Sequence, residues 1–224
     1  MLRIAHKSDL PGITTLWGEA FGDSPETVSC FFHSFSSCVS YVAEDQGRIV
    51  SMVHALPHVL SPDIPAAYIY AVATLQAYRG AGLCRQLMAF AEEDLNARGF
   101  SCCVLTPGEP SLFEFYKKLG YETAFTRSRA AFETGTSISL EEYMQLREQL
   151  LTVPHVIYDR NTLEYARDCY SLTFYQTATG CAAASDHYTA ERLPEDLSDK
   201  PFAMVKWLDE PRKLQGAYLG FALE

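Results

Sequence analysis

One stretch limits what this chain can fold into more than any other, and it runs from Tyr68 to Phe100. It begins with aromatic and β-branched residues, which favour a β-strand. It breaks at the glycine-rich residues 79–82, and from Leu83 apolar side chains recur at the spacing of an amphipathic helix. Gly99 stands where the C-cap of that helix is expected. The stretch therefore predicts a strand, a tight turn and a helix, in that order.

A turn of this kind is suited to binding an anion. The first N–H groups of a helix have no intrahelical partner, and the helix dipole places partial positive charge on them. Glycines let the backbone approach a ligand closely, so the combination can cradle a phosphate. The spacing is neither G-x-G-x-x-G nor that of a nucleotide-binding loop with a Lys. The alternative is that the glycines only make a tight strand-to-helix turn.

The run Arg79-Gly80-Ala81-Gly82-Leu83-Cys84 resembles the acetyl-CoA-binding segment of the GCN5-related N-acetyltransferases (GNAT), which reads [RQ]-x-x-G-x-[GA]. Cys84 stands where that family has Gly or Ala, and Cys is also small. The resemblance implies that the pyrophosphate of acetyl-CoA lies on backbone N–H groups here, and that the central strand polarises the thioester. The cofactor-binding positions that it implies are Val72, Thr74, Arg79, Gly80, Ala81, Gly82, Leu83, Cys84 and Arg85.

A second segment strengthens the resemblance. Residues 115–122, FYKKLGYE, look like the family's Y-x-x-L-G-[FY] segment at the expected distance beyond the cofactor helix. In the family, this tyrosine is the usual general acid that protonates the coenzyme A thiolate, which implies that role for Tyr116. The alternative is a core aromatic, because Phe113, Phe115 and Tyr121 surround Tyr116 in the sequence.

The pattern of elements predicts an α/β protein with the GNAT acyl-CoA N-acyltransferase fold, a mixed, mostly antiparallel sheet flanked by helices. Even without the resemblance, it indicates a mixed sheet with a ligand at the end of its central strand. The expected strands are 2–5, 39–43, 48–58, 66–74, 101–106 and 121–133. The expected helices are 9–20, 24–35, 83–98 and 111–119, and a proline-bearing loop covers 60–65.

Residues 1–134 are predicted to form the acetyl-CoA-binding catalytic domain, and residues 135–224 a smaller lobe. Because some acetyltransferases carry a second, partial copy of the fold, we expect the lobe to be such a copy. Its expected elements are a helix over 139–151 capped by Ser139, a helix over 161–170 capped by Asn161, a strand over 175–184 interrupted by Gly180, an exposed loop over 186–201, and closing strands over 202–208 and 216–223.

Composition narrows the classes of function. The 224 residues carry a formal net charge of -10, which argues against a general nucleic-acid binder. The seven cysteines include no C-x-x-C pair, so we expect free thiols and no metal site. No apolar signal region or run of transmembrane length is seen, which predicts a cytoplasmic protein with no membrane partner.

The residues leave the general base open. Several candidates lie on the central strand, on the strands beside it or near the cofactor, and the resemblance to two-lobed relatives adds a C-terminal carboxylate. These candidates are Glu44, His54, His58, Tyr68, Tyr70, Glu109 and Glu224. Water is a further candidate, because about 0.1% of an amine with a pKa near 10 is neutral at pH 7.

The resemblance implies an acetyl-CoA-dependent N-acetyltransferase that acts on a primary amine of a small molecule or peptide by direct attack in a ternary complex. One alternative is a non-catalytic acyl-CoA sensor or partner-binding module, and another is transfer of a different acyl group on the same fold. The acidic balance, with 13 Phe and 13 Tyr, suits a cationic, partly apolar amine. A homodimer is compatible with the sequence.

Overall fold

The computed structural model describes residues 1–126, 135–194, 201–214 and 216–220, which form two compact units. The first unit has helices packed on a mixed, mostly antiparallel sheet, so the predicted fold class is confirmed. The predicted boundary between a catalytic domain and a smaller lobe at residue 134 stays a prediction. The first unit comprises Met1–Pro57, Pro65–Leu105 and Trp207–Glu210, and the second comprises His58–Ile64, Thr106–Lys206 and Pro211–Glu224.

Among the described residues, five neighbouring strands of one nine-stranded sheet belong mainly to the first unit. In order across the sheet they are β1 (Leu2–Ile4), β2 (Val39–Asp45), β3 (Arg48–Leu60), β4 (Ile64–Thr74) and β5 (Cys102–Leu105). β2 is antiparallel to both β1 and β3, whereas β4 and β5 are parallel. A parallel pair needs a crossover connection, and the predicted turn and helix supply it.

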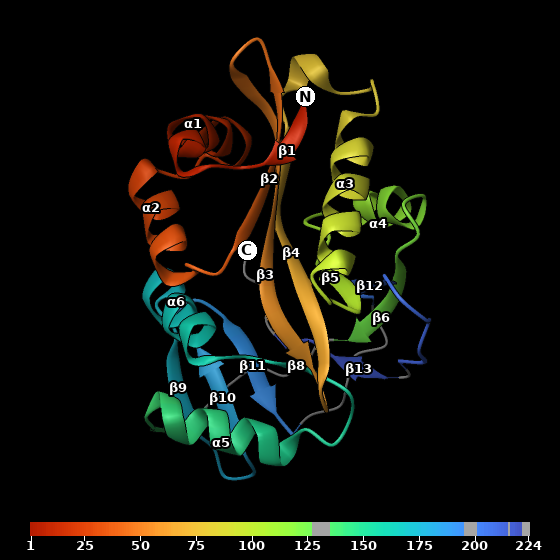
Figure 1. Ribbon diagram of the computed structural model, residues 1–224. Helices are drawn as coiled ribbons and strands as arrows, with labels where there is room; N and C mark the ends of the chain where they lie inside the picture. The colour runs from red at the N-terminus through yellow and green to blue at the C-terminus, as the bar shows by residue number, and fades with distance from the viewer. Residues whose placement is uncertain (127–134, 195–200, 215, 221–224) are drawn as a thin grey trace. The chain divides into compact units, whose positions relative to one another are not determined.

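Helices cover both faces of this sheet. α1 (Leu10–Phe21) and α2 (Pro25–Ser34) lie on one side of β2, β3 and β4, and α3 (Leu83–Ala97) lies on the other (Figure 1). Ser24 caps α2 by accepting a hydrogen bond from the backbone N–H of Thr27 at 3.3 Å. Two short 3₁₀ segments, Lys7–Asp9 and Gln76–Tyr78, precede α1 and α3.

In the second unit, β6 (Glu122–Thr126) follows α4 (Pro110–Lys117). β6 lies between β12 (Ala203–Trp207), to which it is antiparallel, and β13 (Ala217–Tyr218), to which it is parallel. β8 (Val156–Ile157) pairs with the end of β3.

A separate antiparallel sheet in this unit has the order β11-β10-β9-β7. Its strands are β7 (Thr136–Ser137), β9 (Thr173–Gln176), β10 (Cys181–Ala184) and β11 (Thr189–Leu193). α5 (Leu140–Leu150) packs on it through Tyr143, whose ring stacks on Phe174 with centroids 4.5 Å apart. α6 (Arg160–Tyr170) packs beside α5.

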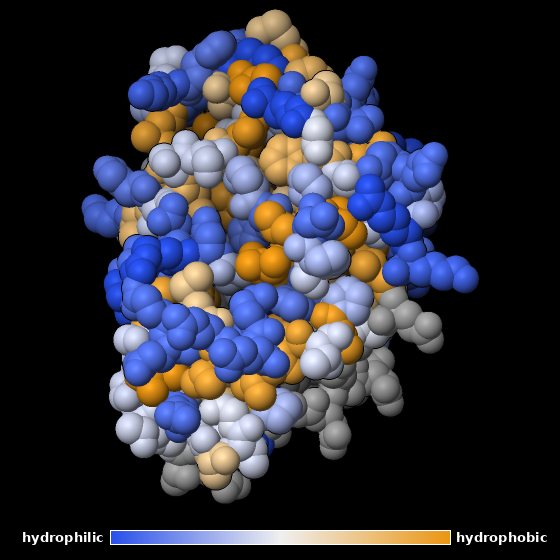
Figure 2. Space-filling view, turned by 60° about the horizontal axis from the view of Figure 1, so that its bottom comes forward, coloured by the Kyte–Doolittle hydropathy of each residue, from blue (hydrophilic) through white to orange (hydrophobic). Residues whose placement is uncertain are grey.

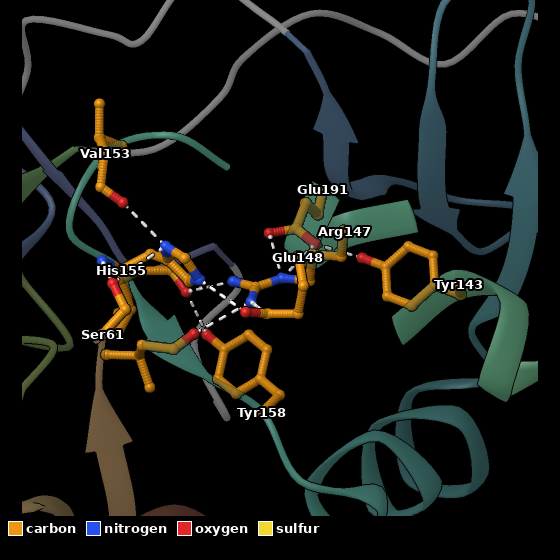
Figure 3. Close-up of polar contacts among 10 residues, drawn as sticks. Ser61, Tyr143, Arg147, Glu148, Val153, His155, Tyr158 and Glu191 are labelled. Carbon is orange, nitrogen blue, oxygen red and sulfur yellow. Dashed lines mark hydrogen bonds and ion pairs between the residues drawn. The ribbon is translucent and has the colours of Figure 1, made fainter. Parts of the chain in front are cut away.

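A buried ion pair joins these elements (Figure 3). Arg147 of α5 is 1% exposed, and its Nε lies 3.1 Å from Oε2 of Glu191 on β11. The same guanidinium donates to the carbonyl of Val156 at 3.0 Å, and Tyr143 donates its hydroxyl proton to Glu191. Burial alone disfavours the charged arginine, but the Glu191 carboxylate keeps the pKa of Arg147 above its ordinary value.

Three C-terminal predictions were wrong, because this second sheet overrides the local pattern. α6 begins at Arg160, and Asp159, rather than Asn161, caps it by accepting from the N–H of Thr162 at 2.8 Å. The predicted strand over 175–184 is the hairpin of β9 and β10, with Gly180 in its turn. The predicted exposed loop contains β11, in which Glu191 is buried because it pairs with Arg147.

The N-terminal elements were predicted with small errors of boundary. The loop between β3 and β4 shortens to residues 61–63, because both strands extend further than expected. The Ser139 cap of α5 is confirmed. The returning strand predicted over 121–133 is β6 as far as Thr126, and residues 127–133 lie outside the described part of the chain.

Hydrophilic side chains cover most of the surface seen in Figure 2, and hydrophobic ones form small separate groups between them. Within the described ranges, no helix is long and apolar enough to cross a membrane. In the described part of the chain, no group of three or more His, Cys, Asp or Glu side chains is placed to hold a metal ion.

Candidate active site

The turn before α3 has the conformation that its glycines permit. Gly80 and Gly82 have φ of +82° and +78°, and Gly82 is the N-cap of α3. A Cβ built on Gly80 would meet nothing within 4 Å, and one on Gly82 only Nε2 of Gln86 at 4.0 Å. The glycines are therefore required by the left-handed backbone and not by packing, and the space above the turn is open to a ligand.

The start of α3 has the features of an anion site. The first helical hydrogen bond runs from the N–H of Gln86 to the carbonyl of Gly82 at 3.0 Å, so the N–H groups of residues 83–85 precede it. The first turn holds no acidic residue, while Arg79 and Arg85 are exposed at its ends. Partial positive charge and two cations thus meet at one exposed helix end.

Side-chain contacts tie this turn to the end of β4. Nε of Arg79 donates to the carbonyl of Thr74 at 2.9 Å, and the hydroxyls of Thr74 and Ser51 lie 2.7 Å apart. Burial raises the pKa of the Cys84 thiol, and a hydrogen bond with Thr74 acts in the opposite direction. Cys84, which departs from the family pattern, is thus a neutral thiol held against the strand.

Partway along β4, the alternation of its side chains between the two faces of the sheet is interrupted. On β3, Ser51 and His54 are three residues apart and point to opposite faces. Tyr70 lies on the His54 face, because its ring is 5.8 Å from that of Trp17, which contacts His54 at 5.0 Å. Thr74 lies on the Ser51 face.

Two residues four apart on a regular strand would share a face, so an extra residue must lie between Tyr70 and Thr74. Ala71 has φ of +47°, which is a left-handed conformation that a non-glycine residue rarely adopts. We infer a β-bulge at Ala71. Strained residues of this kind concentrate at functional sites, and this one lies beside Val72, where the thioester contact is predicted.

The part of β4 that contains Ala71 extends beyond the end of its pairing with β5. The parallel pairing with β5 ends at Tyr68 and Val104, whereas β4 continues to Thr74. Residues 70–72 are only partly buried. The backbone at the bulge is therefore placed at an opening in the sheet, where its polar groups can contact a ligand.

The nine predicted cofactor-binding residues all lie in the first unit, in β4 and in the turn and first residues of α3. The structure brings Thr74, Arg79 and Cys84 into contact. Tyr116 lies on α4 of the second unit and is 7% exposed. Its ring packs against Phe115 at 5.1 Å and Tyr121 at 5.7 Å.

The candidate bases are placed in very different surroundings. Glu44 pairs with Arg3 at 2.6 Å, and Glu109 accepts a hydrogen bond from Ser111. His54 is fully buried, and burial lowers its pKa to about 3, so its imidazole is a weak base. His58 lies in the second unit, 3.4 Å from the hydroxyl of Thr162. Glu224 is outside the described residues.

Sequence reasoning missed two features of the first unit. One is the bulge at Ala71, for which an alanine gives no signal. The other is a group of rings from four elements, which we call the aromatic cluster: Trp17, Phe31, Phe32, His54 and Tyr70. The sequence predicted the helix over 24–35 that carries Phe31 and Phe32, but helical spacing alone does not distinguish a core from a binding surface.

The observed features fit acetyl-CoA. An exposed glycine turn, the unpaired N–H groups at a helix start and two flanking arginines suit a pyrophosphate. The partly buried backbone at residues 70–72 lies on the strand that leads into this turn.

Comparison with known proteins agrees with this geometry. A family model described as "Acetyltransferase (GNAT) domain" matches residues 1–124. The uncharacterized N-acetyltransferase YhbS of Escherichia coli K12 is 28% identical over 130 residues, which are 55% of this chain and 74% of YhbS.

Two solved structures share the fold. A probable N-acyltransferase of Enterococcus faecalis V583 superposes with a TM-score of 0.63 at 21% identity, over 84% of this chain; the match spans 52% of that protein's length. A GCN5-related N-acetyltransferase of Kribbella flavida gives a TM-score of 0.68 at 15% identity, over 93% of this chain and 72% of its own. With the family model covering more than half of its residues, this chain belongs to the GNAT acetyltransferase family.

Proposed function

We propose that this protein transfers the acetyl group of acetyl-CoA to a primary amine of a small molecule or peptide, by direct attack in a ternary complex. The observation that carries the proposal is the conjunction on one stretch of chain of a bulged, partly open strand and an exposed glycine turn that starts a helix. Membership of the GNAT family supports it.

In this proposal the start of α3 holds the cofactor. The N–H groups of residues 80–85 bind the pyrophosphate oxygens, and Arg79 and Arg85 add charge. The hydrogen bond from Arg79 to Thr74 fixes the turn relative to β4. The backbone at Val72 and Thr74 orients the thioester, which supplies an activated acetyl group. Holding it in reach of an amine contributes up to about 7–11 kcal/mol in the best-oriented systems.

Tyr116 has the proposed role of general acid, which gives a proton to the departing thiolate. A hydroxyl with a pKa near 10 is suited to a thiolate of slightly lower basicity when the two lie within hydrogen-bond distance. The acceptor must attack as the neutral amine. His54, with a pKa of about 3, fits the role of base poorly, and solvent is the proposed acceptor of the amine proton.

The test is calorimetric titration with acetyl-CoA of the wild type, Gly82→Trp and Gly47→Trp. Gly47 is a matched control, because its φ is +81°, a Cβ there meets nothing within 4 Å, and it lies in the β2–β3 turn. Both variants bear the same backbone strain. We expect micromolar binding to the wild type and to Gly47→Trp, and no binding to Gly82→Trp.

A thiol-release assay with a panel of amines then separates catalysis from binding. Release that depends on the amine supports the transferase. Binding without release from any amine would instead support the acyl-CoA sensor. The absence of binding to the wild type would overturn both.

A further inference from the structure

The rings of the aromatic cluster contact one another across four elements. The ring of Phe31 on α2 stacks on Tyr70 of β4 at 5.1 Å and 20°, and lies 5.0 Å from the ring of Trp17 on α1. Phe32 contacts Trp17 at 6.2 Å and His54 at 5.5 Å. All five residues belong to the first unit.

The polar atoms of the cluster are unevenly satisfied. Nε1 of Trp17 donates to Oδ2 of Asp23 at 2.7 Å, and Nδ1 of His54 lies 2.8 Å from the hydroxyl of Ser40. Nε2 of His54 is buried and meets no hydrogen-bond partner among the described residues. Burial lowers the pKa of His54 to about 3, so the five rings are all uncharged.

The cluster reaches the surface beside the proposed acetyl group. Phe32 and Tyr70 are only partly buried, whereas Trp17, Phe31 and His54 are buried behind them. Tyr70 directly precedes the bulge at Ala71. Because β4 changes face there, Thr74, which hydrogen-bonds to Cys84 at the start of α3, lies on one face of the strand and the cluster on the other. An acceptor resting on the cluster would approach the bulge from the face opposite the cofactor turn.

We propose that Phe32 and Tyr70, backed by Trp17, Phe31 and His54, form the binding surface for the acceptor, and that the acceptor is a primary amine attached to an aromatic group. This inference rests on the proposed function and names its substrate class. Aromatic rings bind another ring by offset or edge-to-face contacts. An uncharged, weakly polar wall also favours the neutral amine, which is the attacking form.

The experiment compares three acceptors, 2-phenylethylamine, butylamine and spermidine, in the thiol-release assay. Phenylethylamine and butylamine differ by the ring, and spermidine represents an aliphatic polycation. We expect the KM for phenylethylamine to be about tenfold below that for butylamine, the ratio that one or two aromatic contacts supply. Equal use of all three amines, or a preference for spermidine, would overturn the inference.

Variants assign the effect to the cluster. Phe32→Leu and Tyr70→Leu remove one ring each and keep an apolar side chain. We expect each to raise the KM for phenylethylamine several-fold more than the KM for butylamine. The control is Tyr188→Leu, which removes an exposed tyrosine from the second unit. If Phe32→Leu leaves the ratio of the two KM values unchanged, the cluster does not bind the acceptor.

A binding measurement tests the surface independently of turnover. The chain has two tryptophans, so in a Trp207→Phe background Trp17 reports on the cluster alone. Phenylethylamine should quench its fluorescence saturably, and Phe32→Leu should abolish the saturation. If acetyl-CoA fails to bind, the proposed function fails, and quenching then decides only whether the cluster binds an aromatic amine. If acetyl-CoA is used with other amines but quenching is absent, the aromatic surface alone is wrong.

Discussion

The hydroxyl oxygen of Tyr116 is the single atom on which the proposed general-acid step depends. Tyr116→Phe removes a hydroxyl and keeps the ring that packs on Phe115 and Tyr121. If the hydroxyl is the general acid, kcat falls about 100-fold while the dissociation constant of acetyl-CoA is unchanged.

Tyr121→Phe is the matched control for Tyr116→Phe, because Tyr121 is buried in the same group of rings. It should keep the wild-type kcat. Equal rates for wild type and Tyr116→Phe in steady-state assays would mean that Tyr116 is a core aromatic residue and not the general acid.

Because His54 is buried, we predict that the free energy of unfolding depends on pH through this residue. Its folded pKa of about 3 lies below the ordinary value of 6.5, so the unfolded chain binds more protons between these two pH values. Stability from this residue is therefore present above pH 6.5 and is lost as the pH falls toward 3. Between pH 7 and pH 5 the loss is about 2 kcal/mol.

Urea denaturation at pH 7 and pH 5 measures that loss. In His54→Leu the difference between the two pH values should shrink by about 2 kcal/mol. His33→Leu is the control, because His33 is an exposed histidine on α2 and the variant should behave as the wild type. An unchanged difference in His54→Leu would mean that His54 is protonated in the folded protein.

At the scale of elements, the second unit depends on how the chain after β13 meets the buried ion pair. The carbonyl of Leu219 accepts from the Tyr158 hydroxyl at 2.5 Å and from Nη2 of Arg147 at 3.4 Å. A Cβ on Gly220 would overlap Oε1 of Glu191 and lie 3.2 Å from Nη2 of Arg147. Close packing of backbone on a charged pair thus requires glycine here.

Gly220→Ala should therefore destabilise the protein by at least about 2 kcal/mol more than Gly216→Ala, because only the former displaces the ion pair. Gly216 is matched, with a φ of +66° and nothing within 4 Å of a built Cβ. The midpoints of chemical denaturation measure the difference. Equal midpoints for the two variants would show that the pair tolerates the extra methyl group.

For the whole molecule, ligand binding should appear as a gain in stability. Acetyl-CoA at a hundred times its dissociation constant adds about 2.7 kcal/mol if it binds only the folded state. For a chain of this size that raises Tm by about 5–10 °C. Differential scanning calorimetry of the wild type should show this shift, and Gly82→Trp should not. An equal shift in both would place the cofactor away from the turn.

Several features of the whole molecule stay predictions. These are the division of the chain at residue 134, the cytoplasmic location, and the homodimer with which the sequence is compatible. Expression of residues 1–134, fractionation and sedimentation test them in turn.

The sequence by itself determined the parts of this protein that depend on local chemistry. Left-handed glycines and apolar residues of helical spacing specify a turn and a helix whatever surrounds them, so the turn at residues 79–82 and α3 were predicted correctly. The caps at Ser24 and Ser139 are local for the same reason. The GNAT fold followed from these segments and their order.

Only the tertiary structure decided features in which distant residues meet. The bulge at Ala71 lets Tyr70 pack against Phe31 on one face of the sheet while Thr74 hydrogen-bonds to Ser51 on the other. β11 was mistaken for an exposed loop, because its polar Glu191 is buried only through pairing with Arg147, 44 residues away. The aromatic cluster likewise gathers rings from four elements. Such contacts depend on long-range packing, which local sequence periodicity does not encode.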